Sequence, residues 1–584
     1  AIRTFVVTGA NRAIELEWVR QLLVRPGNRV LAGVSGQNES QDVQKMVPGI
    51  EVLPLEAGDA GSLNAWADEV AKKTPHIDGE MSIANKTIVL TGANRGIGLE
   101  WARQLLARPG NRIIAGVRQP DKAADLKALG GSRVQILPLD VSSSTSIESW
   151  ADEIKASTAH VDVVINNAGV YGERQDLGSV TSENMVSTFV ANTVGPLLIV
   201  QALASRGLLG GSAGPTLVAT VSSKMGSVED TSTGSYAYRA SKAGVNIVCK
   251  ALANELGPKG VTVTLLHPGY VITDMTEGRG LIDTATSVGG MLSVLEGGDD
   301  IHGKFLAWDK KARPFKQPNS GFYNTYKTLV ASLCRPLAMS IIEGKTVVVT
   351  GANRGLGREL VNQLLERPGN TIIAGVRDPS QAKDLASLGP NVVVTQLDVS
   401  DEASIEAWAA SLKKDFAHID VVINNAGIAD MEPFGSLKGK LFHSIFQTNA
   451  IGPFLVVQSL HGQGLIGGSG GHTLVATVSS TMGSISENRA DGLPITIGLK
   501  PGGAIPYRSS KSAVNSIMKS LSHDLADQDI TVTLLCPGYV ATDMNGHSGH
   551  IDTQTSVNGM LKVLEENKDL QGSFHYYTGQ YIPW

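Results

Sequence analysis

The stretch that decides the fold is TGANRGIG at Thr91–Gly98, which stands between a short apolar run and an amphipathic segment. It returns as TGANRGLG at Thr350–Gly357 and in part as TGANR at Thr8–Arg12. Glycines at the end of a first strand permit a tight turn and let backbone N–H groups approach a phosphate at the start of the next helix. The spacing is G-x-x-x-G-x-G, not the broader G-x-G-x-x-G, so its position and repetition carry the interpretation.

Long internal repeats set the domain organisation. QLLARPGNRIIAGV begins at Gln104 and returns from Gln21 and Gln363 with few changes, and TLVATVSS begins at both Thr216 and Thr473. The interval is too long for a solenoid and indicates fused domains. The first copy stops where the other two continue as VDVVINNAG and IDVVINNAG. We therefore predict a truncated, degenerate unit at 1–80, a complete unit at 81–315, a linker or extension at 316–338, and a complete unit at 339–584.

Continuous β-branched runs predict strands that are buried on both faces of a parallel sheet. In the first complete unit these runs are Thr87–Leu90, Ile113–Val117, Val134–Leu137, Val161–Ile165, Leu217–Val221 and Val261–Leu266. Helical patterns such as Leu99–Ala107 and Ser146–Ile154 alternate with them. The alternation predicts an α/β fold with a doubly wound, Rossmann-like parallel sheet, in two complete copies plus one truncated N-terminal copy.

Composition narrows the partners and the compartment. The formal net charge of −5 leaves no basic stripe for nucleic acid. No apolar run approaches the roughly 20 residues of a bilayer span, so we expect no membrane association. Cys249, Cys334 and Cys536 lie far apart, which fits neither a zinc site nor a disulfide framework. We expect a cytoplasmic protein without a metal.

Charged residues beside the glycine motif favour NADP(H) over NAD. Arg95 precedes the second glycine and Arg118 follows the second strand, where an adenosine ribose would lie. Two guanidinium groups suit a 2′-phosphate. Each alone is equally well explained as a solvated surface charge, but the second complete unit repeats the pair. Asp140, after the third strand, is a candidate acceptor for the adenine amine. The predicted cofactor contacts here are Gly92, Arg95, Gly96, Ile97, Gly98, Arg118, Asp140 and Val141, and in the second unit Gly351, Arg354, Gly355, Leu356, Gly357, Arg377, Asp398 and Val399.

The pairs Tyr238-x-x-x-Lys242 and Tyr507-x-x-x-Lys511 have the spacing of one helix face. A phenol ordinarily has a pKa of roughly 10. A neighbouring ammonium, together with an oxidised nicotinamide, would favour phenolate, so the tyrosine could exchange a proton with a substrate oxygen. Alone the pattern is usually an accident of an amphipathic helix. Its place after the strand TLVATVSS favours a catalytic role.

Two further polar positions are candidates for the same chemistry. A pair of serines ends the strand TLVATVSS in each complete unit, and we choose the second of each pair, Ser223 and Ser480, to hold the substrate oxygen. Asn192 and Asn449 stand inside apolar helical stretches, where an amide needs a specific partner.

Taken together, TGxxRGxG, NNAG, the serine after a central strand, YxxxK and PGYVxTDM resemble the classical short-chain dehydrogenase/reductases. The ending TGQYIPW at Thr578–Trp584, and a degraded WDKKARPF at Trp308, look like those of the C-factor and sniffer-type carbonyl reductases of that family. The resemblance covers nearly all of residues 84–315 and 341–584.

The resemblance implies two catalytic tetrads, Asn192, Ser223, Tyr238, Lys242 and Asn449, Ser480, Tyr507, Lys511. It implies that the lysine also holds the nicotinamide ribose and that the asparagine orders a water for proton relay. It further implies cofactor contacts from NNAG and PGYVxT, namely Asn167, Ala168, Gly169, Pro268, Gly269, Val271 and Thr273, with Asn425, Ala426, Gly427, Pro537, Gly538, Val540 and Thr542 in the second unit.

The copies differ from one another. In the first unit Ala13 and Glu15 replace motif glycines, and Ser35 and Glu56 replace the arginine and the aspartate, so we predict no cofactor there. In the last unit a Gly- and Pro-rich insertion, Asn488–Ala504, precedes the tyrosine and predicts a lid or specificity loop.

These features predict an NADPH-dependent oxidoreductase that transfers hydride between the nicotinamide and a carbonyl or secondary alcohol of a small molecule at two tandem sites. One alternative is that the two units act in opposite directions, which would invert an alcohol centre. Another is an NADPH-binding sensor or scaffold without turnover. Two fused units also predict an intramolecular pseudo-dimer, with a homo-oligomer as the alternative.

Overall fold

The computed structural model describes residues 3–8, 28–34, 43, 51–54, 83–297, 300–311, 342–488 and 503–584. The predictions for Ala13, Glu15, Ser35 and Glu56, the linker at 316–338 and nearly all of the Asn488–Ala504 insertion lie outside these residues. The described residues form three parallel sheets, which are the predicted truncated copy and two complete copies.

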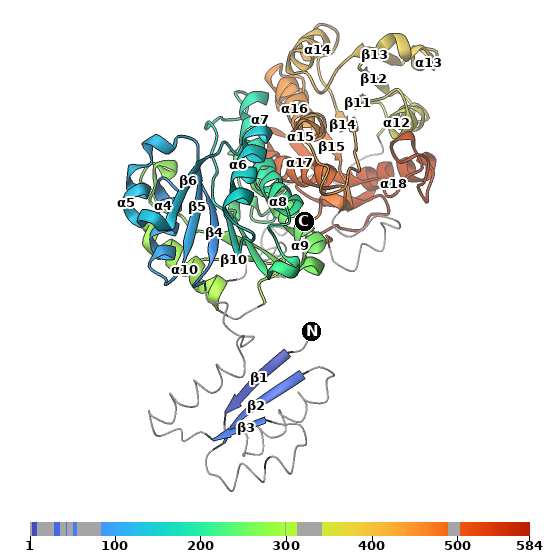
Figure 1. Ribbon diagram of the computed structural model, residues 1–584. Helices are drawn as coiled ribbons and strands as arrows, with labels where there is room; N and C mark the ends of the chain where they lie inside the picture. The colour runs from blue at the N-terminus through green and yellow to red at the C-terminus, as the bar shows by residue number, and fades with distance from the viewer. Residues whose placement is uncertain are drawn as a thin grey trace. The chain divides into compact units, whose positions relative to one another are not determined.

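The N-terminal sheet has three parallel strands in the order β1-β2-β3. They are β1 (Arg3–Thr8), β2 (Asn28–Val34) and β3 (Glu51–Pro54), and they lie side by side in Figure 1. The order matches the first three strands of each complete copy. Val30, Leu31 and Ala32 of the middle strand are fully buried, as expected of a strand flanked on both sides.

The first complete copy has seven parallel strands in the order β10-β9-β8-β7-β4-β5-β6. They are β4 (Thr87–Thr91), β5 (Arg112–Val117), β6 (Val134–Pro138), β7 (Val163–Asn166), β8 (Thr216–Val221), β9 (Val261–His267) and β10 (Phe305–Ala307). All six predicted strands are present. The prediction missed β10, because three residues are too few to show a pattern. The doubly wound, Rossmann-like fold is confirmed.

The second complete copy repeats this sheet in the order β13-β12-β11-β14-β15-β16-β17. Its strands are β11 (Thr346–Thr350), β12 (Thr371–Val376), β13 (Val392–Gln396), β14 (Val421–Asn424), β15 (Thr473–Val478), β16 (Ile530–Cys536) and β17 (Phe574–Tyr576). In each seven-stranded sheet the strand order reverses between the first and fourth strands of the copy, and ligands bind at the carboxyl edge of such a switch point.

Helices cover both faces of each seven-stranded sheet (Figure 1). In the first complete copy they are α4 (Gly96–Leu106), α5 (Ala124–Gly130), α6 (Ser144–Ser157), α7 (Ser182–Phe189), α8 (Gly195–Ser205), α9 (Tyr236–Leu256) and α10 (Thr284–Glu296). In the second they are α12 (Gly355–Leu365), α13 (Lys383–Ala386), α14 (Glu402–Asp415), α15 (Gly439–Phe446), α16 (Gly452–Gly462), α17 (Ile505–Asp524) and α18 (Thr553–Glu566). Short π-helical segments, η3 (Val190–Val194) and η9 (Gln447–Ile451), join α7 to α8 and α15 to α16.

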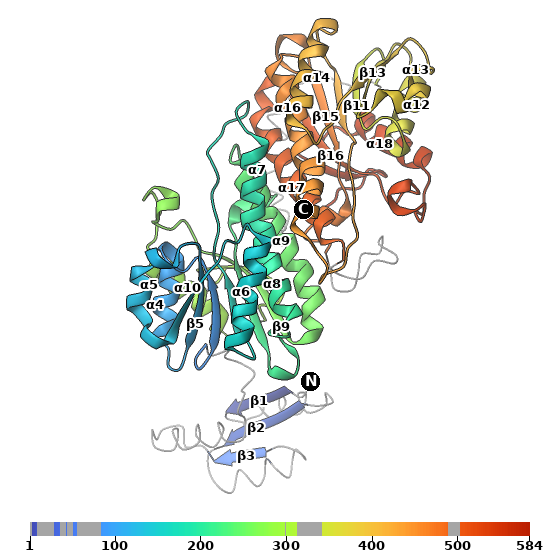
Figure 2. The same ribbon diagram turned by 45° about the horizontal axis from the view of Figure 1, so that its top comes forward.

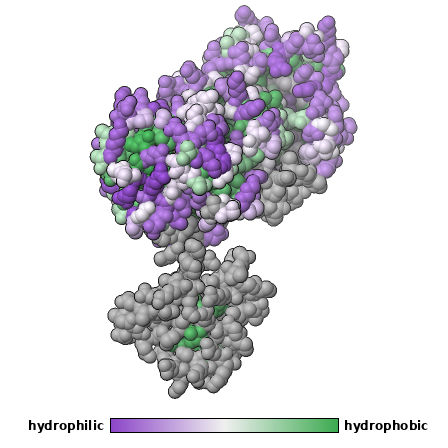
Figure 3. All heavy atoms as spheres, viewed as in Figure 1, coloured by the Kyte–Doolittle hydropathy of each residue, from purple (hydrophilic) through white to green (hydrophobic). Residues whose placement is uncertain are grey.

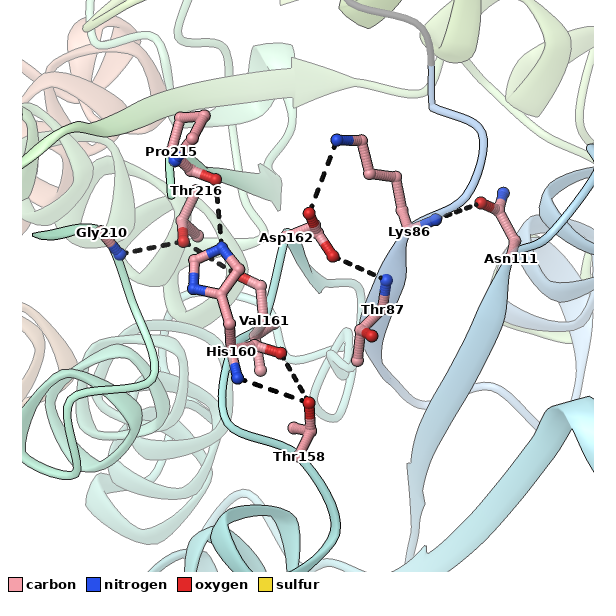
Figure 4. Close-up of polar contacts among 10 residues, drawn as sticks. All are labelled: Lys86, Thr87, Asn111, Thr158, His160, Val161, Asp162, Gly210, Pro215 and Thr216. Carbon is pink, nitrogen blue, oxygen red and sulfur yellow. Dashed lines mark hydrogen bonds and ion pairs between the residues drawn. The ribbon is translucent and has the colours of Figure 1, made fainter. Parts of the chain in front are cut away.

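Polar contacts fix the amino edge of the first complete sheet, opposite the carboxyl edge (Figure 4). The Asp162 carboxylate accepts a hydrogen bond from the backbone N–H of Thr87 at 2.8 Å and pairs with Lys86 at 3.5 Å. The Thr216 hydroxyl donates to the Val161 carbonyl at 2.8 Å. These bonds hold the starts of β4 and β8 against the entry to β7, and the second copy repeats them.

The two complete copies pack against each other through equivalent helices, with α9 beside α17 (Figure 2). The rings of Phe189 and Phe446 stack with centroids 3.6 Å apart. The Gln201 carboxamide accepts from the Gly435 N–H at 3.0 Å, and the equivalent Gln458 accepts from the Gly178 N–H at 3.0 Å. Because each side makes the contact that the other makes, the arrangement is that of a two-fold pseudo-dimer within one chain. One large apolar cluster contains residues of both copies, and a further cluster lies within the second copy.

One apolar stretch is longer than expected from the sequence. Ser182–Ser205 has the length and composition of a bilayer span, so the prediction that no run approaches that length is wrong. Its most apolar window is 83% buried inside the protein, because it forms α7, η3 and α8. Figure 3 shows hydrophilic residues over most of the visible face of the two complete copies. The apolar stretch is therefore explained as core helix.

Candidate active site

The glycine motif forms a turn with no room for side chains between β4 and α4. Gly92 has φ +66°, in the left-handed region that favours glycine, and an added Cβ would lie 3.0 Å from the Ala168 Cα. A Cβ on Gly98 would lie 2.0 Å from the Gly92 carbonyl oxygen and 2.7 Å from the Asn167 Nδ2. Gly351 and Gly357 repeat these contacts in the second copy. The turn thus presents bare backbone, as a pyrophosphate requires.

The start of α4 is open to an anion. Its N-cap residue, Arg95, is extended, and no described side chain caps the first turn. The N–H groups of Gly96, Ile97 and Gly98 are the ones such a turn leaves without intrahelical partners. Helix α12 begins in the same way after Arg354, with Gly355, Leu356 and Gly357 in its first turn. These residues therefore fit the phosphates of a dinucleotide.

The predicted phosphate arginines are exposed at this edge. Arg95 pairs with Asp274 at 3.3 Å, and Arg354 pairs with Asp543 at 3.4 Å. The sequence interpretation missed both ion pairs, although each acid belongs to the TDM of the PGYVxTDM motif. Arg118 follows β5 and Arg377 follows β12, and both are exposed.

The predicted adenine acceptors and their neighbours follow the third strand of each sheet. One carboxylate oxygen of Asp140 accepts from the Ser142 N–H at 2.9 Å, and Asp398 does the same with Ser400. Val141 and Val399 come next, and their carbonyl oxygens lie against Gly195 and Gly452, at the starts of α8 and α16.

The two remaining cofactor motifs border the same edge. Asn167 donates from Nδ2 to the Thr91 carbonyl at 3.1 Å, and Ala168 donates its N–H to the Thr91 hydroxyl at 3.0 Å, so NNAG is tied to the glycine turn. After β9, Gly269 has φ +89° and Val271 bridges Ile282. The equivalent residues of the second copy are arranged alike: Asn425, Ala426, Gly427, Pro537, Gly538, Val540 and Thr542. In the first copy the Asn192 side chain lies next to Gly169, and the Thr273 side chain lies next to Gly96. The carbonyl oxygen of Pro268 accepts a hydrogen bond from the Ser287 hydroxyl.

Serine, tyrosine and lysine meet at the end of β8. The Ser223 hydroxyl lies close enough to the Tyr238 phenol to lower its pKa. The Lys242 Nζ lies 5.6 Å from the centroid of the Tyr238 ring and donates to the Val221 carbonyl at 3.0 Å. The serine before this one, Ser222, is turned away to Asn246 at 2.6 Å. The structure thus brings together the serine, tyrosine and lysine that we predicted from the sequence to take part in proton transfer.

The second copy assembles the same group at the end of β15. The Ser480 hydroxyl lies close enough to the Tyr507 phenol to lower its pKa. The Lys511 Nζ lies 5.7 Å from the centroid of the Tyr507 ring and donates to the Val478 carbonyl at 2.8 Å.

Burial is the main cause of the shifted pKa values of the tyrosine and the lysine in each copy. Burial raises the pKa of Tyr238 to about 12, and the hydrogen bond from Ser223 opposes that rise. Burial also lowers the pKa of Lys242 to about 8. In the second copy burial raises the pKa of Tyr507 and lowers that of Lys511 to about 8. Burial therefore keeps each phenol protonated at neutral pH.

The predicted asparagines lie in the π-helical segments and brace the loop after NNAG. Asn192 accepts from the Val170 N–H at 2.8 Å, and its Nδ2 donates to the Val170 carbonyl at 2.7 Å and to Ser241 at 2.9 Å. Asn449 makes the equivalent bonds to Ile428 and Ser510. π-helical turns are frequent at functional sites.

An aromatic stack distinguishes the first site and was missed by the sequence interpretation. Tyr171 lies against the catalytic candidate Tyr238 with ring centroids 4.7 Å apart and planes 26° apart. Arg174 lies over the Tyr171 ring at 5.3 Å and pairs with Glu277 at 3.6 Å. In the second copy Ala429 and Gly546 take the places of Tyr171 and Glu277. The two sites therefore present different surfaces to a substrate.

A glycine-lined turn at the switch point of a parallel sheet, beside a serine, a tyrosine and a lysine, defines a nucleotide-binding oxidoreductase of the Rossmann type. The chain belongs to the short chain dehydrogenase family, whose model matches residues 86–281 and 345–551 and thus more than half of the chain. Members of this family use nicotinamide cofactors.

Curated relatives and a solved structure agree with this assignment. An uncharacterized oxidoreductase of Schizosaccharomyces pombe is 32% identical over 262 residues, which is 41% of this chain and 98% of the relative. The C-signal protein of Myxococcus xanthus is 41% identical over 160 residues, 27% of this chain and 95% of that protein. The N-domain of a bacterial malonyl-CoA reductase, solved with NADP, covers 85% of this chain and 97% of its own with a TM-score of 0.63 and 16% identity. That likeness supports the fold.

Proposed function

We propose that each complete copy is an NADPH-dependent carbonyl reductase that acts on a small-molecule ketone or aldehyde. The observation that carries this proposal is the meeting of serine, tyrosine and lysine beside a bare-backbone turn, at Ser223, Tyr238 and Lys242 and again in the second copy. When bound, NADPH supplies the hydride that the carbonyl carbon receives.

The protein's own groups then manage the substrate oxygen. The Ser223 hydroxyl holds this oxygen, and the Tyr238 hydroxyl donates its proton to it, so that a carbonyl becomes an alcohol. Tyr238 is protonated at neutral pH, which is the form that a reduction needs. The Lys242 ammonium, 5.6 Å from the ring, stabilises the phenolate left behind.

The choice of NADPH rests on the paired arginines. Arg95 and Arg118 in the first copy, and Arg354 and Arg377 in the second, are exposed beside the elements where we expect the ribose 2′-phosphate to bind, and two guanidinium groups suit that phosphate. Arg95, which pairs with Asp274 at 3.3 Å, would be one of the residues that hold this phosphate.

The direct test is consumption of NADPH by the full chain with a panel of ketones, aldehydes and quinones. We expect oxidation of NADPH in step with alcohol formation and much slower turnover with NADH. Stoichiometric binding of NADPH with no oxidation across the panel would instead favour a sensor or scaffold.

A second candidate is that the two sites act in opposite directions on one compound. Differences between the copies near the two sites favour this candidate. In an alignment of the copies, Ala429 corresponds to Tyr171 and Gly546 corresponds to Glu277. Such a protein would convert one alcohol enantiomer into the other through the ketone. Chiral chromatography after incubation of each enantiomer with both cofactor forms would show inversion if this candidate holds and retention if it does not.

A further inference from the structure

The segment that leads into the first catalytic helix is held by the other copy. The Asp524 carboxylate, at the last residue of α17, accepts a hydrogen bond from the Gly234 N–H at 3.1 Å. The same oxygen accepts from the hydroxyl of Tyr236, the first residue of α9. Tyr236 is 1% exposed, and its ring lies 4.8 Å from that of Phe454 in the second copy. The Tyr236 end of this anchor is therefore buried, while Asp524 and Gly234 are half-buried, and Tyr236 lies two residues before Tyr238.

The anchored segment also touches the ring of the catalytic tyrosine. Ser235, between the two anchored residues, has φ +55°, which costs a non-glycine residue free energy and needs surrounding contacts to persist. Its hydroxyl bonds the Tyr171 hydroxyl at 2.6 Å, and the Tyr171 ring stacks on Tyr238. A continuous set of contacts thus runs from Asp524 to the reacting phenol.

The second site has no matching anchor at the equivalent positions. Ile505 stands where Tyr236 does and has no hydroxyl, and Ala504 stands in place of Ser235. Glu255, the equivalent of Asp524, bonds Lys259 of its own copy at 3.5 Å. The end of α9 reaches the second copy through Asn254 and Asn488, a neutral contact at 3.4 Å.

From this asymmetry we propose that Asp524 is a positioning residue for the first active site, so that the second copy supports the catalysis of the first without receiving the same support in return. The inference rests on the proposed role of Tyr238. Loss of the carboxylate leaves a buried hydroxyl and a backbone N–H without an acceptor, which favours movement of the first turn of α9. A small displacement of a catalytic group is enough to slow a reaction strongly.

The test uses the full chain in two backgrounds, Tyr507→Phe to report the first site and Tyr238→Phe to report the second. The assay follows NADPH oxidation with the ketone, aldehyde or quinone of the panel on which each background is most active. In the Tyr507→Phe background we expect Asp524→Ala to lower kcat by about tenfold with a smaller change in KM. Asp524→Asn should restore most of the rate, because both donors use one oxygen, which an amide also offers. In the Tyr238→Phe background Asp524→Ala should leave kcat unchanged.

Glu255→Ala is the matched control, since it removes the equivalent carboxylate of the first copy and should leave both sites unchanged. An unaltered first-site kcat in Asp524→Ala, or an equal loss at both sites, would overturn the inference. If Tyr238→Phe itself leaves first-site turnover intact, the proposed function fails instead, so the two failures are distinguishable.

Discussion

At the scale of single residues, Lys242 and Lys511 are ammonium groups that burial weakens, with pKa values of about 8. A depressed lysine pKa means that the charged form is present below pH 8 and is lost as pH rises through that value. Tyr238, with a pKa of about 12, stays protonated over the same range. We expect kcat/KM for reduction to be level up to about pH 7 and to fall above about pH 8, because the developing phenolate loses its counter-charge.

A pH–rate profile, measured at a saturating concentration of NADPH, checks this prediction. A rate that stays level to pH 10 would show that the lysine charge plays no part. Neither pKa value was predictable from the sequence, because Tyr-x-x-x-Lys spacing shows proximity and says nothing about burial. The lysine does lie near the tyrosine ring in each copy, but burial is the main cause of the shift in the tyrosine pKa.

At the scale of elements, the glycine turns give a prediction that separates the two sites. Gly98→Ala would place a Cβ 2.0 Å from the Gly92 carbonyl oxygen, so the turn must open and the first site should lose NADPH affinity by at least about tenfold. Gly357→Ala should do the same to the second site. Titration of each variant with NADPH should show one remaining site of ordinary affinity. Two ordinary sites in either variant would contradict the assignment of the turn.

The amino edge of the sheet gives the opposite prediction, an effect on stability without an effect on chemistry. Asp162→Ala removes a partly buried carboxylate that binds the Thr87 N–H and Lys86. We expect the free energy of unfolding to fall by about 1.5–3 kcal/mol, the usual worth of hydrogen bonds to charged groups. Denaturant unfolding measures the loss, and kcat of the folded protein should be unchanged. A lost kcat with unchanged stability would place Asp162 in the site instead.

How far elements can be predicted depends on their length and on the range of their contacts. The runs that form β4 to β9 are continuous and apolar, so the sequence predicts them closely. The three residues of β10 carry no such pattern. The stack of Tyr171 on Tyr238 escaped prediction because it joins a loop to a helix through tertiary packing alone. Motifs that depend on backbone geometry could be predicted from the sequence, whereas contacts that depend on tertiary packing could not.

At the scale of the whole molecule, the two complete copies use their equivalent helices against each other within one chain. This interface contains the stacked rings of Phe189 and Phe446 and the hydrogen bonds of Gln201 and Gln458. We therefore expect a mass near 61.4 kDa for the protein in dilute solution. Light scattering coupled to size exclusion measures it. A particle of twice that mass would show that another surface pairs the chains.

The repeats in the sequence predicted the number of copies, and the reciprocal contacts explain why they stay together. The asymmetric anchor of Asp524 was not predictable, because it joins residues from separate copies that no motif links. Sequence comparison of the copies does show where such asymmetry is possible, since Tyr236 and Ile505 differ at otherwise matching helices.

The central claim is that one chain holds two tyrosine-dependent reductase sites. It is tested most directly by NADPH oxidation in four proteins, the parent chain, Tyr238→Phe, Tyr507→Phe and the double variant, each with carbonyl substrates found for the parent. We predict that each single variant loses one share of the activity and that the double variant falls by about 100-fold or more, the usual worth of a positioned acid. A double variant that keeps the parent's rate would contradict the account.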